Sequence, residues 1–142
     1  MEDNTPQITF GLNGITTQQY ALIEGIHNPD NPSDFQLTFN FAKDNERRMV
    51  GVFSNFVFQQ NEKTFLIIEC GCHFEIPPES WGFIIQKDGS AILPQTFVTH
   101  LAMVTVGVTR GVLHSKLENT GIRVLIPLIN ITEVFKENLE MQ

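Results

Sequence analysis

Apolar and polar residues alternate along residues 7–15, and this period of two predicts a half-buried strand at the start of the fold. The following stretch, residues 16–35, contains Pro29 and Pro32 among Asn and Asp residues. Because Pro removes a backbone donor and restricts the residue before it, this stretch is predicted to be a crossover loop.

The middle of the chain returns to alternation. Apolar and polar residues alternate along residues 35–41 and 50–58, so each stretch is predicted to be a strand. In the second stretch the alternation shifts at Ser54, which predicts a bulge there. A polar turn at residues 61–63 separates this strand from another at 65–76. Such short connections favour antiparallel pairing, so the sequence predicts an antiparallel meander.

Residues 95–119 carry two conflicting signals. Val and Thr are common and favour a strand, whereas the apolar residues recur every three or four positions, the period of a helix. The segment lacks Pro over a length far beyond that of a common strand, and Gly121 follows it as at a helix end. One long helix is therefore predicted. Its first half is apolar on nearly every side and is expected to be covered on both faces, while Gly107 and Gly111 would let another backbone approach closely.

The C-terminal part of the chain is predicted to hold an extended strip and a second helix. Residues 123–129 are apolar and interrupted by Pro127, and residues 131–141 place Val134, Phe135 and Leu139 on one side of a short amphipathic helix. A half rich in strands followed by a half rich in helices indicates the α+β class.

Composition narrows the range of partners. The 142 residues fit a single domain, 1–142, and 42% hydrophobic residues predict an ordered core. Nine Lys and Arg against sixteen Asp and Glu give a formal charge of −7, so no basic stripe is expected for nucleic acid.

The longest uncharged stretch contains many polar residues, which argues against membrane insertion, and the acidic N-terminus predicts a cytoplasmic location.

Candidate chemistry is sparse in this sequence. Cys70, Cys72 and His73 are metal-ligand types, but in a strand the two thiols point away from the imidazole. His100 and His114 would lie ~21 Å apart on one helix, too far to act on one atom. The chain also has no phosphate-binding glycine motif. We therefore expect no metal, no cofactor and no catalytic residues.

Twelve Phe residues supply more apolar surface than one face of a small sheet needs. Part of this surface is expected to form an oligomer interface or a groove for other polypeptides, because exposed apolar patches usually mark binding.

The order of these parts resembles the SecB export-chaperone family. Residues 63–69, KTFLIIE, with 74–76, FEI, are similar to the third strand of that family; 110–116, RGVLHSK, is similar to the end of its long helix. Residues 124–130, VLIPLIN, are similar to its Leu-x-Pro-(Val/Ile)-Asn segment. The resemblance covers about residues 35–139. This chain departs from the family at the start of the long helix, where SecB has Cys-Pro and this chain has Thr96–Phe97. The acidic C-terminal tail that is typical of SecB is also short or missing here.

The resemblance implies an antiparallel four-stranded sheet with a long helix packed on it and a short C-terminal helix. It also implies dimers with helices between sheets and a tetramer built as a dimer of dimers. The helix residues expected at the oligomer interface are Leu101, Val104, Val108 and Gly111.

The function implied is ATP-independent binding of unfolded or partly folded polypeptides, for protein export or for a dedicated partner such as a toxin–antitoxin client. The client groove would lie between the crossover loop and the C-terminal helix, lined by Ile23, Ile26, Phe35, Ile131, Val134 and Phe135. Docking of the SecA motor would use Leu66 and Glu69.

Two other classes of function remain open at this point. The same sheet and helix could serve an assembly or scaffold subunit that binds no client. Alternatively, an enzyme could bind a small apolar ligand between sheet and helix, with His100 or His114 as acid or base.

Overall fold

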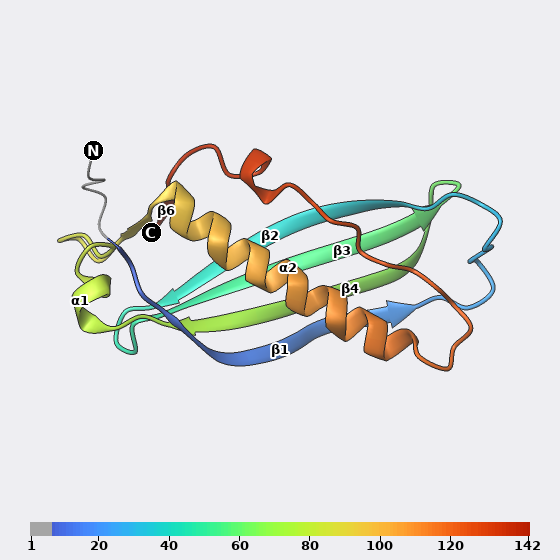
Figure 1. The fold of residues 1–142 in the computed structure, drawn as a ribbon, viewed down its shortest axis with the longest axis horizontal. Coiled ribbons are helices and arrows are strands. Elements are labelled where there is room, and N and C mark those ends of the chain that lie inside the picture. Colours follow the sequence, from blue (N-terminus) through green and yellow to red (C-terminus); the bar gives the residue numbers. More distant parts are fainter. Residues whose placement is uncertain (1–6) are drawn as a thin grey trace.

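The computed structural model describes residues 7–142 as a four-stranded antiparallel sheet crossed by one long helix (Figure 1). The α+β prediction is confirmed. The sheet strands are β1 (Gly11–Leu22), β2 (Asp34–Asp44), β3 (Met49–Gln60) and β4 (Lys63–Glu75), and the helix is α2 (Gln95–Leu117). Shorter elements are α1 (Pro78–Trp81), β5 (Ala91–Leu93), the 3-10 turn η1 (Ile131–Glu133) and β6 (Leu139–Met141).

The strand order β1-β4-β3-β2 places the first two strands at opposite edges of the sheet. The crossover loop between them starts at Ile23 rather than at residue 16, because β1 runs on to Leu22 in antiparallel pairing with β4. Gln60 braces the loop: its amide nitrogen donates to the carbonyls of Asn28 and Asn31, and its amide oxygen accepts from the backbone N–H of Asn28. The side chain is almost fully buried, so the loop is attached to the end of β3.

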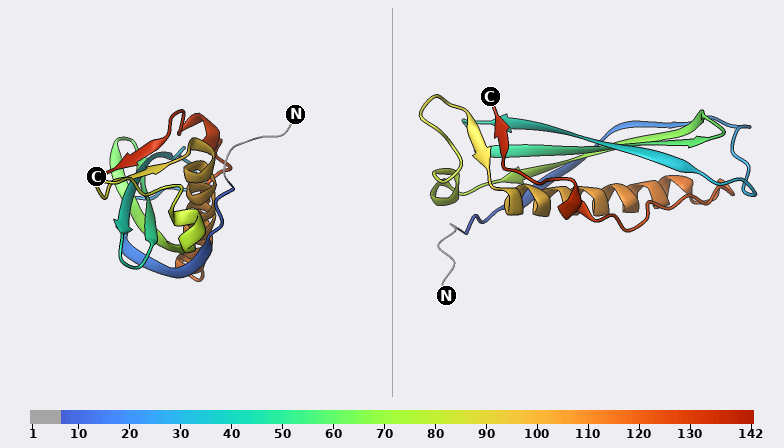
Figure 2. Two further views of the ribbon diagram at one scale, coloured as in Figure 1. Left: turned by 90° about the vertical axis from the view of Figure 1, so that its left-hand side faces the viewer. Right: turned by 90° about the horizontal axis from the view of Figure 1, so that it is seen from above.

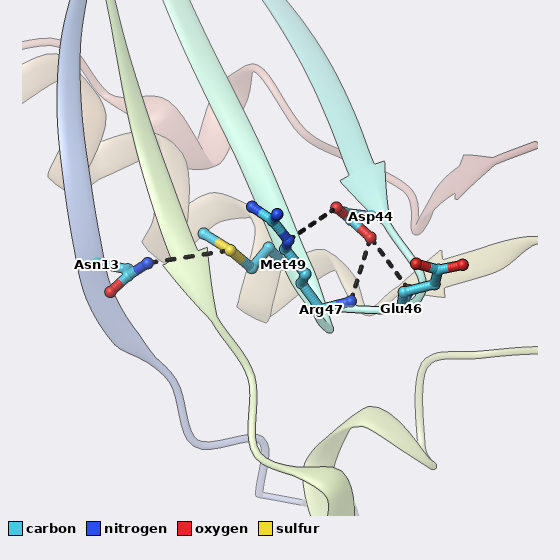
Figure 3. Close-up of polar contacts among 5 residues, drawn as sticks. All are labelled: Asn13, Asp44, Glu46, Arg47 and Met49. Atoms are coloured by element: carbon cyan, nitrogen blue, oxygen red, sulfur yellow. Dashed lines mark hydrogen bonds and ion pairs between the residues drawn. The ribbon is translucent and has the colours of Figure 1, made fainter.

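Two tight turns fix the register of the meander. Between β3 and β4, Asn61 and Glu62 both have positive φ, 51° and 66°, as a two-residue type I′ hairpin requires. Between β2 and β3, Asp44 Oδ1 accepts from the backbone N–H groups of Glu46 and Arg47, each at 3.1 Å (Figure 3). These turns confirm the predicted antiparallel meander.

The bulge predicted at Ser54 is wrong. Strand β3 pairs with both neighbours without interruption at this position, and its buried face continues through Val52, Ser54 and Phe56. The apparent change of phase arises because a buried serine stands on the inner face while Phe53 lies on the outer one.

Helix α2 lies across one face of the sheet (Figure 2). Its inner side packs on the sheet in two apolar clusters. The first is built around Val52, Phe74 and Leu101, and the second around Phe56, Phe65 and Leu113. Between them lies a small polar layer of fully buried hydroxyls from Ser54, Thr105 and Thr109. The prediction of one long helix is therefore confirmed, although within this chain α2 is covered on one face.

By length and composition alone, α2 is also apolar enough to cross a membrane. Half of the qualifying stretch is buried against the sheet, which is common for the core helix of a globular domain.

The predicted helix over residues 131–141 is wrong. The chain forms one 3-10 turn at Ile131–Glu133, and then Leu139–Met141 pairs with Ala91–Leu93 as the two-stranded sheet β5–β6. The apolar residues that suggested one helix face are used differently, because Phe135 packs against Phe39 and Phe41 of β2 with ring centroids 5.3 and 5.8 Å apart. Tertiary packing and strand pairing outweigh the weak helical preference of this short segment.

Candidate functional site

The side of α2 that faces away from the sheet is apolar and partly open to solvent. We call Met103, Val104, Gly107, Val108 and Gly111 the outer strip. Met103 is 54% exposed, the two valines are half-buried, and a methyl group built on either glycine would meet no other atom within 4 Å. The outer strip therefore leaves room for another chain at the centre of the helix.

A second apolar element runs beside α2. Residues 122–130, which we call the strap, form neither helix nor strand and lie alongside the helix in both views (Figures 1 and 2). Arg110 of α2 holds the strap in place, since its Nε donates to the carbonyl of Ile126 and its Nη2 donates to that of Pro127, both at 2.8 Å. Charge-assisted bonds of this kind are among the stronger ones in proteins.

The strap buries one side chain and exposes its neighbours. Ile126 is inserted in the second apolar cluster, whereas Leu125 is 70% exposed and Leu128 is 94% exposed. A leucine exposed to this extent gains about 1.5–3 kcal/mol when it is fully removed from water. The two leucines flank the carbonyls bound by Arg110, so the strap exposes apolar side chains next to the place where it is held on α2.

The predicted groove residues are only partly available to a client. Ile131 is buried in the second cluster, and Ile26, Phe35 and Phe135 pack against that same cluster. These four side chains therefore pack into the core of the chain itself and do not line an open groove. Ile23 and Val134 remain accessible, at 45% and 47% exposure.

The other predicted contact residues also divide into buried and accessible ones. Leu101 is fully buried between helix and sheet, so it cannot line an interface with another chain in this conformation; Val104, Val108 and Gly111 can. Leu66 is likewise fully buried, while Glu69 is partly exposed on the opposite face of β4. A docking partner could therefore touch Glu69 but not Leu66.

Two hollows accompany these surfaces. One, of about 530 Å³, lies at the C-terminal end of α2 between His114, Glu118, Arg123 and Leu125. The other, of about 420 Å³, lies between β2 and β6 and is lined by the consecutive residues 39–43 and 139–142. Sequence reasoning missed the second hollow because β6 was expected to be part of a helix.

The titratable side chains of residues 7–142 do not converge on a reaction centre. No group of three or more His, Cys, Asp or Glu in this part of the chain could hold a metal ion. His100 packs on Phe10, whereas His114 lies 3.5 Å from Glu118 at the other end of α2. The separation inferred from the helical spacing is thus seen in the structure.

The two cysteines are buried on the helix-facing side of β4, and His73 lies on the opposite side, as the strand pattern predicted. Desolvation by burial raises the pKa of both thiols, which suppresses the thiolate needed for metal binding or nucleophilic attack.

Comparisons with known proteins add no functional information. No family model and no curated protein matches the chain. A solved structure described as a protein of unknown function from Streptococcus agalactiae aligns with a TM-score of 0.41 and 15% sequence identity, over 87% of this chain and 99% of that one. A similarity of this degree carries no argument about fold or function.

Proposed function

We propose that this protein is an ATP-independent chaperone that holds unfolded or partly folded polypeptides, as its sequence resemblance to the SecB family implies. The observation that carries the proposal is the exposure of large apolar side chains on the strap and on the outer strip, since Leu125, Leu128 and Met103 are more than half exposed. Exposed apolar patches usually mark binding sites. Removing such side chains from water stabilises a complex without any bond being made or broken.

The affinity of one such surface is expected to be modest. Ordering a flexible client costs part of the free energy gained from apolar contact, so tight holding needs several sites acting together. A tetramer built as a dimer of dimers would supply them. Whether the clients are exported proteins or one dedicated partner depends on which polypeptides the cell offers.

The test is suppression of aggregation of a chemically denatured client, without ATP. The double variant Leu125→Ser/Leu128→Ser changes two exposed side chains and should fold normally. It is expected to protect the client about tenfold less well, since two leucine contacts are lost. The matched control is Leu12→Ser/Ile15→Ser, which removes two exposed apolar side chains of β1 and should protect like the wild type. Failure of the wild type to protect any client would overturn the proposal.

A second candidate function, assembly without client binding, is favoured by one observation. The open space above Gly107 and Gly111 suits close contact with a second copy of the chain. Gly107→Glu places a charge at a position where an added Cβ meets no neighbouring element, and Ser115→Glu adds the same charge elsewhere on the exposed helix surface. If the outer strip is an interface, the first variant lowers the solution mass and the second does not. A wild-type chain that sediments as a monomer contradicts this reading.

A further inference from the structure

Strand β2 is an edge strand with an unusually regular backbone. It pairs with β3 over its whole length, from Asp34 opposite Gln59 to Asp44 opposite Met49, without a shift of register. Residues 35–42 within it carry no charge and no Pro. Among the described residues, no backbone group of β2 bonds to anything other than β3. Its outer row of N–H and C=O groups is therefore ready to pair with another extended chain.

The opposite edge strand, β1, differs in this respect. Its pairing with β4 shifts between Leu12 and Gly14 and again between Thr17 and Gln19. Such irregularities twist an edge and interrupt its row of donors and acceptors, which is a common protection against strand addition. The edge formed by β1 is thus protected against the addition of another strand, whereas the edge formed by β2 lacks this protection.

The hollow of about 420 Å³ marks where an added chain would sit. It is lined on one side by five consecutive residues of β2, 39–43, and on the other by residues 139–142. Because successive side chains of a strand point to opposite faces, a hollow that touches all five lies along the edge of the strand rather than over one face. Phe39 and Phe41 line the hollow and Phe135 packs against both rings, so side chains of an added strand would find an aromatic wall.

Charge selects the kind of chain that would bind. Strand β2 and the C-terminal residues 131–142 together carry two lysines against five carboxylates. One of those lysines, Lys43, is already engaged with the carbonyl of Gly89 at 2.9 Å. An extended segment that alternates apolar and basic or neutral residues complements this edge, whereas an acidic segment is repelled.

We propose that the edge of β2 captures extended client segments by β-strand addition, with the main chain of the client hydrogen-bonded to residues 35–43. This inference rests on the holding function proposed above and adds the edge of β2 to the surfaces that would contact a client. Main-chain pairing supplies affinity for many sequences, and the aromatic wall with its acidic border supplies selectivity.

The first experiment uses a fluorescent ten-residue peptide in which Val and Phe alternate with Thr and Lys. Two N-methylated versions carry three methyl groups each, on the odd or on the even residues of the peptide. An added strand bonds to the edge through every second residue, so one version should bind at least about tenfold more weakly and the other should bind like the parent. Equal binding by all three peptides overturns strand addition while leaving the holding function intact. No binding by the parent peptide, together with no protection of a client, overturns both proposals.

The second experiment locates the site on the protein. Hydrogen exchange of the full chain should show that the parent peptide protects alternate amides of β2 and leaves those of β1 unchanged. Protection that grows with protein concentration, without peptide, would assign the edge to a second copy of the chain and overturn the client assignment.

The charge reversal Glu133→Lys/Glu137→Lys should weaken peptide binding several-fold at low salt, and the matched reversal Glu79→Lys/Glu118→Lys, away from β2, should not. Equal effects of both reversals would contradict local charge selection.

Discussion

The side chain of Ser54 on β3 lies 2.6 Å, oxygen to oxygen, from that of Thr109 on α2, in the buried layer between the two apolar clusters. The Thr109 hydroxyl donates its hydrogen to the carbonyl of Thr105 at 2.8 Å, so Ser54 is the donor of this bond and Thr109 the acceptor. This pair therefore links the helix to the sheet by a directional contact, in addition to the apolar packing on either side of it.

Replacing Thr109 by Val should destabilise the protein by about 1–3 kcal/mol, because the buried hydroxyl of Ser54 loses its acceptor while the volume of the side chain is kept. The double variant Ser54→Ala/Thr109→Val should recover part of this loss, since neither partner then remains unpaired. Urea unfolding of the wild type, both single variants and the double variant gives the coupling energy. Strictly additive effects would show that the bond does not couple strand and helix.

Cys70 and Cys72 should make stability depend on pH in the alkaline range. Burial raises the pKa of both thiols in the folded state above the ordinary value of 9.0, so the folded protein holds these protons more tightly than the unfolded chain. The contribution is fully present below pH 9.0 and is lost as the pH rises above it. The free energy of unfolding of the wild type should therefore fall more between pH 8 and pH 10.5 than that of Cys70→Ala/Cys72→Ala. An equal fall in the free energy of unfolding of the two proteins would contradict the raised pKa values of the thiols.

Gly71 is required on the outer face of the sheet because the ring of Phe53 lies across it. A methyl group at this position would stand 2.5 Å from two carbons of the ring, closer than any real contact. Gly71→Ala should lower the free energy of unfolding by about 1–3 kcal/mol through overpacking, measured by urea unfolding. Adding Phe53→Val should restore much of the loss. The control Gly107→Ala, at a helix position with open space, should stabilise the fold by up to about 1 kcal/mol.

Arg110 should matter for the strap through the shape of its guanidinium as well as through its charge. Lys keeps the charge but cannot donate to the carbonyls of Ile126 and Pro127 in the same forked geometry. Arg110→Lys is expected to cost about 1–3 kcal/mol and to speed cleavage of the strap by a protease that cuts after leucine. Arg123→Lys, an equal exchange at an exposed strap residue, is the control. Unchanged cleavage in Arg110→Lys would show that the strap is held by Ile126 alone.

The strands and the long helix could be predicted from the sequence because their signals are local and long. Alternation over seven or more residues defined most of the meander, and the length of segment 95–119 decided between strand and helix. The bulge at Ser54 was predicted wrongly because a polar residue in an alternating strand is normally assigned to the solvent-facing side, whereas this serine is buried. Its partner on α2 is distant in the sequence, and no local pattern reveals such a pair.

The candidate site was harder to predict than the fold. The sequence drew attention to the C-terminal region and to the outer glycines of α2, but it could not separate Leu101, which the sheet covers, from Val104, which it does not. Nor could it show that residues 139–141 pair with residues 91–93, because such pairing depends on the path of the whole chain. The exposure of Leu125 and Leu128 likewise depends on where Arg110 holds the strap.

The crossover loop has a consequence for how this protein is made. Strands β2, β3 and β4 join through short turns and can assemble as soon as each has left the ribosome, whereas β1 finds its place only beside β4. Of the four strands, the one synthesised first is thus among the last to pair, and until then the edge of β4 where β1 belongs stays open.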